Sequence, residues 1–153
     1  MLDKIDLQIL AILQEDLSTP ISFIAEKVSL SNSPCWRRIQ RLEKEGFILK
    51  NVALLNAKKM GLGVTVFVSI KTNNHSQEWF KNFQQVIMNI PEVLEFYRMS
   101  GEVDYFLKVV VSNIESYDVV YKKLINNTDL FDVSSSFAME EMKYSTALPL
   151  KIL

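Results

Sequence analysis

Four basic side chains gather in one short stretch of the sequence, NSPCWRRIQRLEKEG at residues 32–46. Arg37, Arg38, Arg41 and Lys44 fall within eight residues, with a single acidic residue among them. An arginine guanidinium can donate two parallel hydrogen bonds to a guanine edge or to a phosphate, whereas a lysine ammonium acts on phosphate as a point charge. The stretch is therefore a candidate contact for nucleic acid, although a basic helix face can also be a solvated surface paired with neighbouring acids.

The rest of the chain does not share this positive charge. The 153 residues carry a formal net charge of −1, with 48% hydrophobic and 23% charged residues, which is ordinary for a globular protein. Residues 1–59 contain nine Lys/Arg and seven Asp/Glu, whereas residues 60–153 contain eight and eleven. A polyanionic partner is thus predicted for one local surface and not for the chain as a whole.

Other reactive side chains are sparse. Cys35 is the only cysteine, and His75, in the loop NNHSQ, is the only histidine. Neither residue belongs to a nucleophile–base pair or a spaced set of metal ligands, so we predict no catalytic residue and no metal site. Cys35 is interpreted as a small core residue rather than a redox sensor. A small ferredoxin-like enzyme stays a remote alternative, because fold alone does not exclude catalysis.

The chain shows no sign of export or membrane insertion. A single cysteine permits no internal disulfide, which fits a reducing compartment. The start MLDKIDLQIL lacks the features of a signal peptide, and runs such as VVV at 109–111 are far too short to cross a bilayer. These features predict a cytoplasmic protein with no membrane partner.

Three helices are predicted to position the basic stretch. Apolar residues recur at helical spacing in LDKIDLQILAILQED, Ser22 can cap a short second helix, and Ser31 can cap the third. Gly46 ends the third helix, and FILKNVALLN at 47–56 is predicted to form two short strands. A short helix, a tight turn and a longer basic helix are typical of a helix-turn-helix motif, here in a winged DNA-binding domain at 1–56.

The third helix turns an apolar stripe that includes Cys35 toward the first two helices. Its N-terminal turns, with Arg37, are predicted to meet base edges in the major groove, and Arg41 and Lys44 to point outward and meet phosphates. Trp36 can be either a partly buried support or a contact to sugar or thymine methyl. The DNA-binding candidates are Ser31, Asn32, Ser33, Trp36, Arg37, Arg38, Gln40, Arg41, Lys44 and Lys50.

The second half has a different pattern. AKKMGLG at 57–63 is interpreted as a linker, and residues 64–153 then alternate β-branched or aromatic strands with two amphipathic helices. The order is β-α-β, a turn at 101–103, then β-α-β, which predicts a ferredoxin-like sandwich and an α+β protein overall. The helices cover only one face of its antiparallel sheet. The other face is expected to be apolar and to associate with a second copy, giving a homodimer.

Taken together, these motifs resemble the Lrp/AsnC, or feast/famine, family of transcription regulators over essentially the whole chain. The similarity is carried by LDKIDLQILAILQED, LSNSPCWRRIQRLEKEGFI, VALLNAKKMGLG and SGEVDYFLKVVV in this order and spacing. It implies a sequence-specific DNA-binding regulator that dimerises through its sheets, assembles into rings such as a tetramer of dimers, and responds to a small amino acid bound between dimers. The stretches PCWRRIQRLE and SSFAMEEMKYSTALPL are most similar to the family's cysteine-responsive branch.

The resemblance also implies where the amino-acid effector binds, and no other cofactor. An amino acid needs a carboxylate for its ammonium, which Asp104 can supply, and amide donors for its carboxylate, which the turn at Gly101 can expose. Asp104 can instead cap the turn, and the serines at 134–136 can simply fill the last strand. The chain can also be an architectural DNA-binding protein without an effector. The implied effector-binding residues are Tyr97, Met99, Ser100, Gly101, Asp104, Tyr105, Ser134, Ser135 and Ser136.

Overall fold

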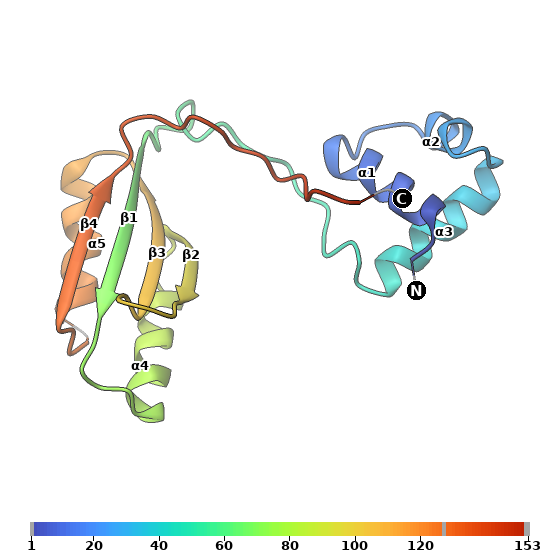
Figure 1. Ribbon diagram of the computed structural model, residues 1–153. Coiled ribbons are helices and arrows are strands. Elements are labelled where there is room, and N and C mark those ends of the chain that lie inside the picture. The colour runs from blue at the N-terminus through green and yellow to red at the C-terminus, as the bar shows by residue number, and fades with distance from the viewer. Residues whose placement is uncertain (1, 127, 152–153) are drawn as a thin grey trace. The chain divides into compact units, whose positions relative to one another are not determined.

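The computed structural model describes residues 2–126 and 128–151, which fold into two compact units (Figure 1). One unit runs to Leu54 and takes in the chain again from Met142, and the other is Leu55–Glu141. Each unit has its own core. Within the described residues, no helix combines the length and apolarity needed to span a bilayer.

The last residues group with the first unit, whereas the division drawn from the sequence places them in the second domain at 64–153. A pair of hydrogen bonds holds this tail. The Gln14 side chain accepts the Leu148 N–H at 2.9 Å and donates to the Leu148 carbonyl at 3.0 Å. These two hydrogen bonds engage both backbone groups of Leu148 and hold the tail beside the first helix.

Three helices form the first unit: α1 is Lys4–Glu15, α2 is Ile21–Lys27 and α3 is Asn32–Lys44. Their apolar faces enclose a small core whose buried residues are Ile9, Ile24, Ala25, Val28, Cys35 and Leu42. The predicted inward position of Cys35 is confirmed, since its side chain is fully buried. Helical periodicity alone therefore identifies the stripe by which α3 is held.

The caps differ in part from those predicted. Asp3 caps α1: its Oδ1 accepts the Asp6 N–H at 2.8 Å, and Asp6 Oδ2 accepts the Asp3 N–H at 3.1 Å. The prediction of a Ser22 cap is wrong, because α2 begins directly after the extended Pro20 and Ser22 falls inside its first turn. Ser31 does occupy the N-cap of α3, but its side chain makes no capping hydrogen bond.

The two strands predicted for 47–56 do not form. Gly46, at φ +77°, ends α3 in the left-handed conformation, and the next two amides donate back to the Leu42 carbonyl at 2.9 and 3.3 Å. The chain beyond them is irregular and makes no strand ladder. Lys50-Asn51 lacks the glycine that a tight two-residue hairpin turn favours, so the alternation of this segment has no turn to fold around.

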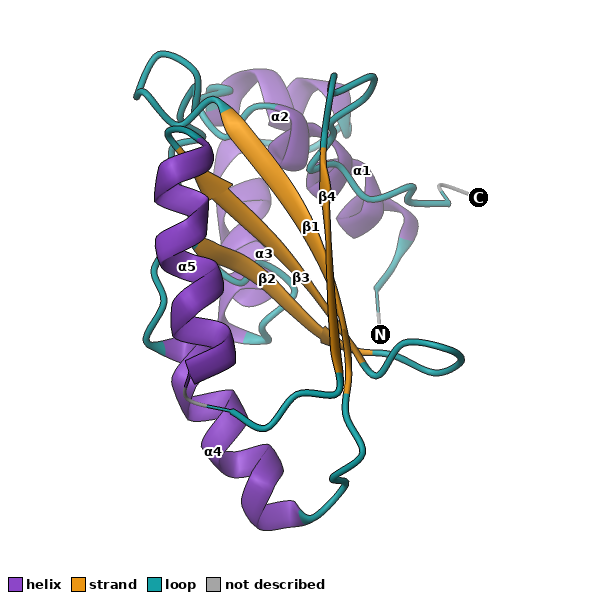
Figure 2. Ribbon diagram, turned by 90° about the vertical axis from the view of Figure 1, so that its left-hand side faces the viewer, coloured by secondary structure: helices purple, strands orange, loops and turns teal. Residues whose placement is uncertain are grey.

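The second unit is the predicted βαββαβ sandwich. Its sheet has the order β2-β3-β1-β4 with all neighbours antiparallel, and α4 and α5 cover one face (Figure 2). The elements are β1 Val64–Lys71, α4 Gln77–Met88, β2 Val93–Arg98, β3 Tyr105–Val111, α5 Ile114–Asn126 and β4 Asp132–Phe137.

Alternation along the strands sends one set of side chains into the core. Val66, Val68 and Ile70 of β1 are fully buried beneath the helices. Tyr105 of β3 lies in an aromatic cluster in which the Phe83 ring centroid is 5.1 Å away. The larger unit is thus held by aliphatic and aromatic burial, and Thr72 is its single buried polar residue among those described.

The opposite sheet face is mixed rather than wholly apolar. Phe67 and Phe106 stack across neighbouring strands with ring centroids 5.8 Å apart. Beside them Lys108 Nζ lies 3.1 Å from Glu95 Oε1, and the Tyr97 hydroxyl donates to Glu95 Oε2 at 2.8 Å. This face therefore carries an aromatic strip flanked by an ion pair.

Candidate nucleic-acid interface and effector site

The basic residues of α3 divide into two groups. Arg38 and Arg41 turn toward α1, where the Asp6 side chain is fully buried. Arg38 Nη1 lies 2.8 Å from Asp6 Oδ1 and 2.6 Å from Asp3 Oδ2, and Arg41 Nη2 contacts Asp6 Oδ2. A buried carboxylate needs such partners, because an uncompensated charge in the interior is strongly unfavourable.

This charged cluster has a consequence for titration. The Asp6 backbone N–H and the Arg38 guanidinium both favour the ionised carboxylate, which lowers the pKa of Asp3. Hydrogen bonds to Asp3 and Asp6 raise the pKa of Arg38. Asp3 and Arg38 therefore stay charged near neutral pH, and the ion pairs of the cluster tie the side of α3 to the first turn of α1.

Arg41 lies on the exposed side of α3 that was predicted for it, with 42% of its side-chain surface accessible, but its guanidinium is also bound to Asp6. A helical wheel places it beside Arg37, but its long side chain reaches across to Asp6. Arg38 makes contacts of the same kind, with Asp3 and Asp6. Both DNA-binding candidates are therefore engaged in an internal ion cluster, which helical spacing could not reveal.

Arg37 and Lys44 form the second group. Both are exposed, and among the described residues neither has an acidic partner. Gln40, between them, donates to Glu43 at 3.0 Å. Seven residues of helix put Arg37 and Lys44 about 10 Å apart along the axis. The free positive charge of α3 thus lies at two separated points on one side.

The N-terminal half of α3 is also where Trp36 lies, with 54% of its surface exposed. Trp36 lines a hollow together with Ile21, Asn32, Ser33 and Arg37. Ser31, at the N-cap, is exposed next to them. Five of the ten DNA-binding candidates therefore gather at this end of the helix: Ser31, Asn32, Ser33, Trp36 and Arg37.

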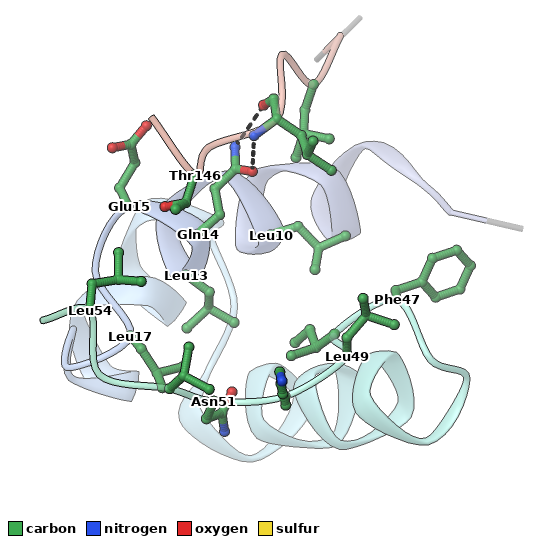
Figure 3. A pocket seen from close by; sticks show the side chains of 15 residues that line it. Leu10, Leu13, Gln14, Glu15, Leu17, Phe47, Leu49, Asn51, Leu54 and Thr146 are labelled. Atoms are coloured by element: carbon green, nitrogen blue, oxygen red, sulfur yellow. Dashed lines mark hydrogen bonds between the residues drawn. The ribbon is translucent and has the colours of Figure 1, made fainter. Parts of the chain in front are cut away.

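Lys50 lies away from α3. It lines an apolar groove of about 420 Å³ between α1, the segment after α3 and the tail, where the Gln14 hydrogen bonds to the Leu148 backbone are visible (Figure 3). Leu10, Leu13 and other leucines form most of its walls. No group in this lining pairs a nucleophile with a base, so the groove has the character of a packing surface.

Cys35 is buried beneath α3, and burial raises the pKa of its thiol. A protonated, buried thiol is a poor nucleophile, in agreement with its interpretation as a core residue. His75 lines a polar hollow with Asn73, Asn74 and Asp129. Among the residues that the structure describes, no three His, Cys, Asp or Glu side chains are grouped so that they could hold a metal.

The β2–β3 turn places Asp104 at the centre of a small hydrogen-bond network. Its Oδ2 accepts the Thr72 N–H at 2.8 Å, its N–H donates to the Ile70 carbonyl at 3.0 Å, and its carbonyl accepts the Met99 N–H at 2.8 Å. Gly101 supplies the positive φ, +115°, that the turn requires. Asp104 therefore does cap the turn, with one carboxylate oxygen, while its other oxygen has no protein partner among the described residues.

The remaining effector candidates are not all on one surface. Met99 and Ser100 lie with Gly101 on the exposed turn. Tyr97 is on the open sheet face, where its hydrogen bond to Glu95 raises the pKa of its phenol. The Tyr105 side chain is only 4% exposed and belongs to the helix-side core, because it follows the alternation of β3.

The three serines of β4 point to different faces. Ser135 is on the helix side, where its hydroxyl hydrogen-bonds the Tyr117 hydroxyl. Ser134 and Ser136 pair with Ser69 and Phe67 of β1 and face the open side. Since β1 lies between β3 and β4, the backbones of those two strands are about 10 Å apart. One chain alone therefore does not bring the serines against the Asp104 turn.

Two structural partners were missed in the sequence. Asp6 falls on the same helical stripe as Ile9, Leu10 and Leu13, and a carboxylate in an apolar stripe signals a buried ion pair. Thr72 gave no comparable signal in the sequence, because it contacts Asp104 through its backbone N–H, which every residue except proline has.

Comparisons with known proteins agree with the two units. Residues 2–48 match the model of a winged helix-turn-helix DNA-binding domain, and residues 65–148 match the Lrp/AsnC ligand binding domain. The chain is 50% identical over 152 residues to the DNA-binding transcriptional activator DecR of Escherichia coli, which covers 99% of this chain and 100% of the relative.

Solved structures give the same result. An AsnC family transcriptional regulator from Agrobacterium tumefaciens superposes with a TM-score of 0.92 at 54% identity, covering 97% of both chains. A transcriptional regulator from Neisseria meningitidis in complex with L-Met superposes with a TM-score of 0.91 at 32% identity, again covering 97% of both.

Proposed function

Because the chain belongs to the Lrp/AsnC family of DNA-binding transcription regulators and is not an enzyme, we propose that it reads its operator through the N-terminal half of α3. Arg37 would pair with a guanine edge in the major groove, and Lys44 would contact phosphate. Arg38 and Arg41 would act within the protein, holding α3 against Asp6.

One observation carries this proposal. Arg37 is the arginine of α3 that is exposed and has no acidic partner among the described residues, whereas both of its arginine neighbours are bound to Asp6. A bidentate contact to a base needs a guanidinium that is not already engaged. The position of Arg37 in the second turn of the helix fits the part of the motif that enters the groove.

The test compares Arg37→Ala with Lys44→Ala on a preferred duplex and on random DNA. Arg37→Ala should cost about 1–3 kcal/mol on the preferred duplex and narrow the difference between the two DNAs. Lys44→Ala should weaken both similarly and reduce the salt slope of binding by about one unit. Lys122→Ala on α5 is the control for lost charge alone. Equal loss of discrimination in the Arg37 and Lys44 variants would contradict the assignment.

The ligand binding domain is proposed to take a small amino acid, with cysteine or another sulfur or apolar amino acid favoured. The L-Met complex of the Neisseria relative supports a sulfur amino acid, as does the similarity of the tail sequence to the cysteine-responsive branch. Asp104 would meet the ammonium and the Gly101 turn the carboxylate. An effector-free architectural protein is the alternative, and its melting temperature would not rise with any of the twenty amino acids.

The open sheet face is proposed as the dimer interface, with dimers assembling further into rings of four and the effector between them. Its stacked Phe67 and Phe106 support this, because these rings are only half-buried within one chain and a partner would cover the rest of their apolar surface. Two reading helices in a dimer would then favour palindromic half-sites spaced near one helical turn of DNA. Sedimentation at micromolar concentration should give a dimer or larger species, and a monomer would contradict the proposal.

A further inference from the structure

A hollow of about 410 Å³ lies at the N-terminal end of α3, beside the start of α2. Ile21 and Trp36 give it a mostly apolar surface, and Asn32, Ser33 and Arg37 complete its lining. Ile21 is half-buried and packs against the core of the first unit, so this wall is fixed. A ligand in the hollow therefore meets an immobile apolar wall with polar groups beside it.

Trp36 is the second wall, and its exposure is unusual for a residue of its size. More than half of its surface is accessible. It precedes Arg37 directly, and both line the hollow. A group that enters the hollow would therefore lie next to the base that the Arg37 guanidinium is proposed to contact.

We propose that this hollow is a subsite for the 5-methyl group of a thymine, on a base pair neighbouring the guanine that Arg37 contacts. The inference rests on the proposed entry of this half of α3 into the major groove. Of the groups on base edges there, the thymine methyl is the apolar one, and apolar side chains recognise it by contact. A phosphate could accept hydrogen bonds from the polar part of the lining, but it would leave the apolar surface of Ile21 and the Trp36 ring without a matching apolar group.

The experiment uses the full chain and begins by selecting preferred duplexes from a random pool. Each thymine in the selected site is then replaced by deoxyuridine, which pairs identically and lacks only the methyl group. At one thymine per half-site the replacement should weaken binding about four-fold, the effect of burying one methyl group, about 0.8 kcal/mol. Fluorescence anisotropy gives the ratio of the two dissociation constants.

Trp36→Ala tests the assignment. It should weaken binding to the thymine duplex and bring the ratio at that position close to one, because the wall that contacts the methyl is gone. Phe23→Ala is the matched control: it removes an aromatic side chain of α2 that is 47% exposed and lies outside the hollow. The control should keep the four-fold ratio. Thermal melting checks that both variants are folded.

The outcomes separate the inference from the function on which it rests. If selection enriches no sequence, the proposed reading of DNA fails. If a site is enriched but no thymine is sensitive to loss of its methyl, the subsite is wrong while the regulator stands. If Trp36→Ala weakens thymine and uracil duplexes equally, Trp36 contacts sugar and the subsite is again wrong.

Discussion

Two aspartates, one in each unit, show how the same side chain serves different ends. Asp6 in α1 is fully buried, and its two oxygens are occupied by the Asp3 N–H, Arg38 and Arg41. Asp104 in the β2–β3 turn is partly exposed, and one of its oxygens accepts the Thr72 N–H. A saturated carboxylate can only position what it binds, whereas a half-saturated one can also receive a ligand.

The same distinction sorts the arginines of α3. Arg38 and Arg41 are the partners that saturate Asp6, and they belong to the framework of the first unit. Arg37 is free to engage DNA. We therefore expect saturation of hydrogen-bonding groups, rather than residue type or position on a helical wheel, to separate the charges that hold the fold from those proposed to bind DNA.

The largest effect on stability is expected when the saturated Asp6 carboxylate is removed. Asp6→Ala takes the shared partner from Arg38 and Arg41, and breaking a buried ion pair in this way should lower the free energy of unfolding by roughly 3 kcal/mol. Urea denaturation of the full chain followed by circular dichroism measures the loss. Asp118→Ala, which breaks an exposed pair with Lys122 on α5, should cost only about 0.3–0.5 kcal/mol. Equal losses would remove the distinction.

A smaller effect is expected at the half-saturated carboxylate. Asp104→Asn keeps an oxygen for the Thr72 N–H but loses the charge proposed to meet the effector ammonium. The effector concentration needed to change DNA binding should rise about 10- to 100-fold, the range for a hydrogen bond to a charged group of about 1.5–3 kcal/mol. DNA affinity without effector should not change.

Asp104→Ala is the companion variant, because it also removes the acceptor for Thr72. It should abolish the response and loosen the turn, seen as faster hydrogen exchange of the Thr72 amide. An Asn variant that responds with unchanged affinity would refute the ammonium contact. A responsive Ala variant would move the effector site elsewhere.

Much of the fold was predictable because its signals are local. Helical spacing identifies the faces of α1 and α3, and strand alternation gives the order of the second unit. The prediction of a hairpin at 47–56 is wrong for two reasons. Its alternating residues lack a favourable turn, and the N–H groups of Phe47 and Ile48 donate to the Leu42 carbonyl at the end of α3. The cap predicted at Ser22 is wrong because the N-cap of α2 is Pro20, two residues earlier in the chain.

The candidate sites were predictable as regions but not as sets of contacts. Spacing places Arg41 on the outer face of α3, yet a side chain of that length can reach a charge on another helix. Tyr105 and Ser135 could have been assigned to the helix side from alternation with Leu107 and Val133. What spacing cannot supply is the distance between β3 and β4, which depends on β1 lying between them.

The smallest effect is expected at Asp3, the exposed member of the Asp6 cluster. Its pKa lies below the ordinary value of 3.8, because the Asp6 N–H and Arg38 favour its ionised form. A carboxyl whose pKa is lower in the folded state stabilises the fold above its unfolded pKa, and this contribution disappears as pH falls through the folded pKa. Asp3→Asn keeps an acceptor for the helix cap but cannot titrate. Between about pH 5 and pH 3, the melting temperature of the wild type should therefore fall more steeply than that of Asp3→Asn. Parallel curves would show that the Asp3 charge does not contribute to stability and that Arg38 is stabilised by Asp6 alone.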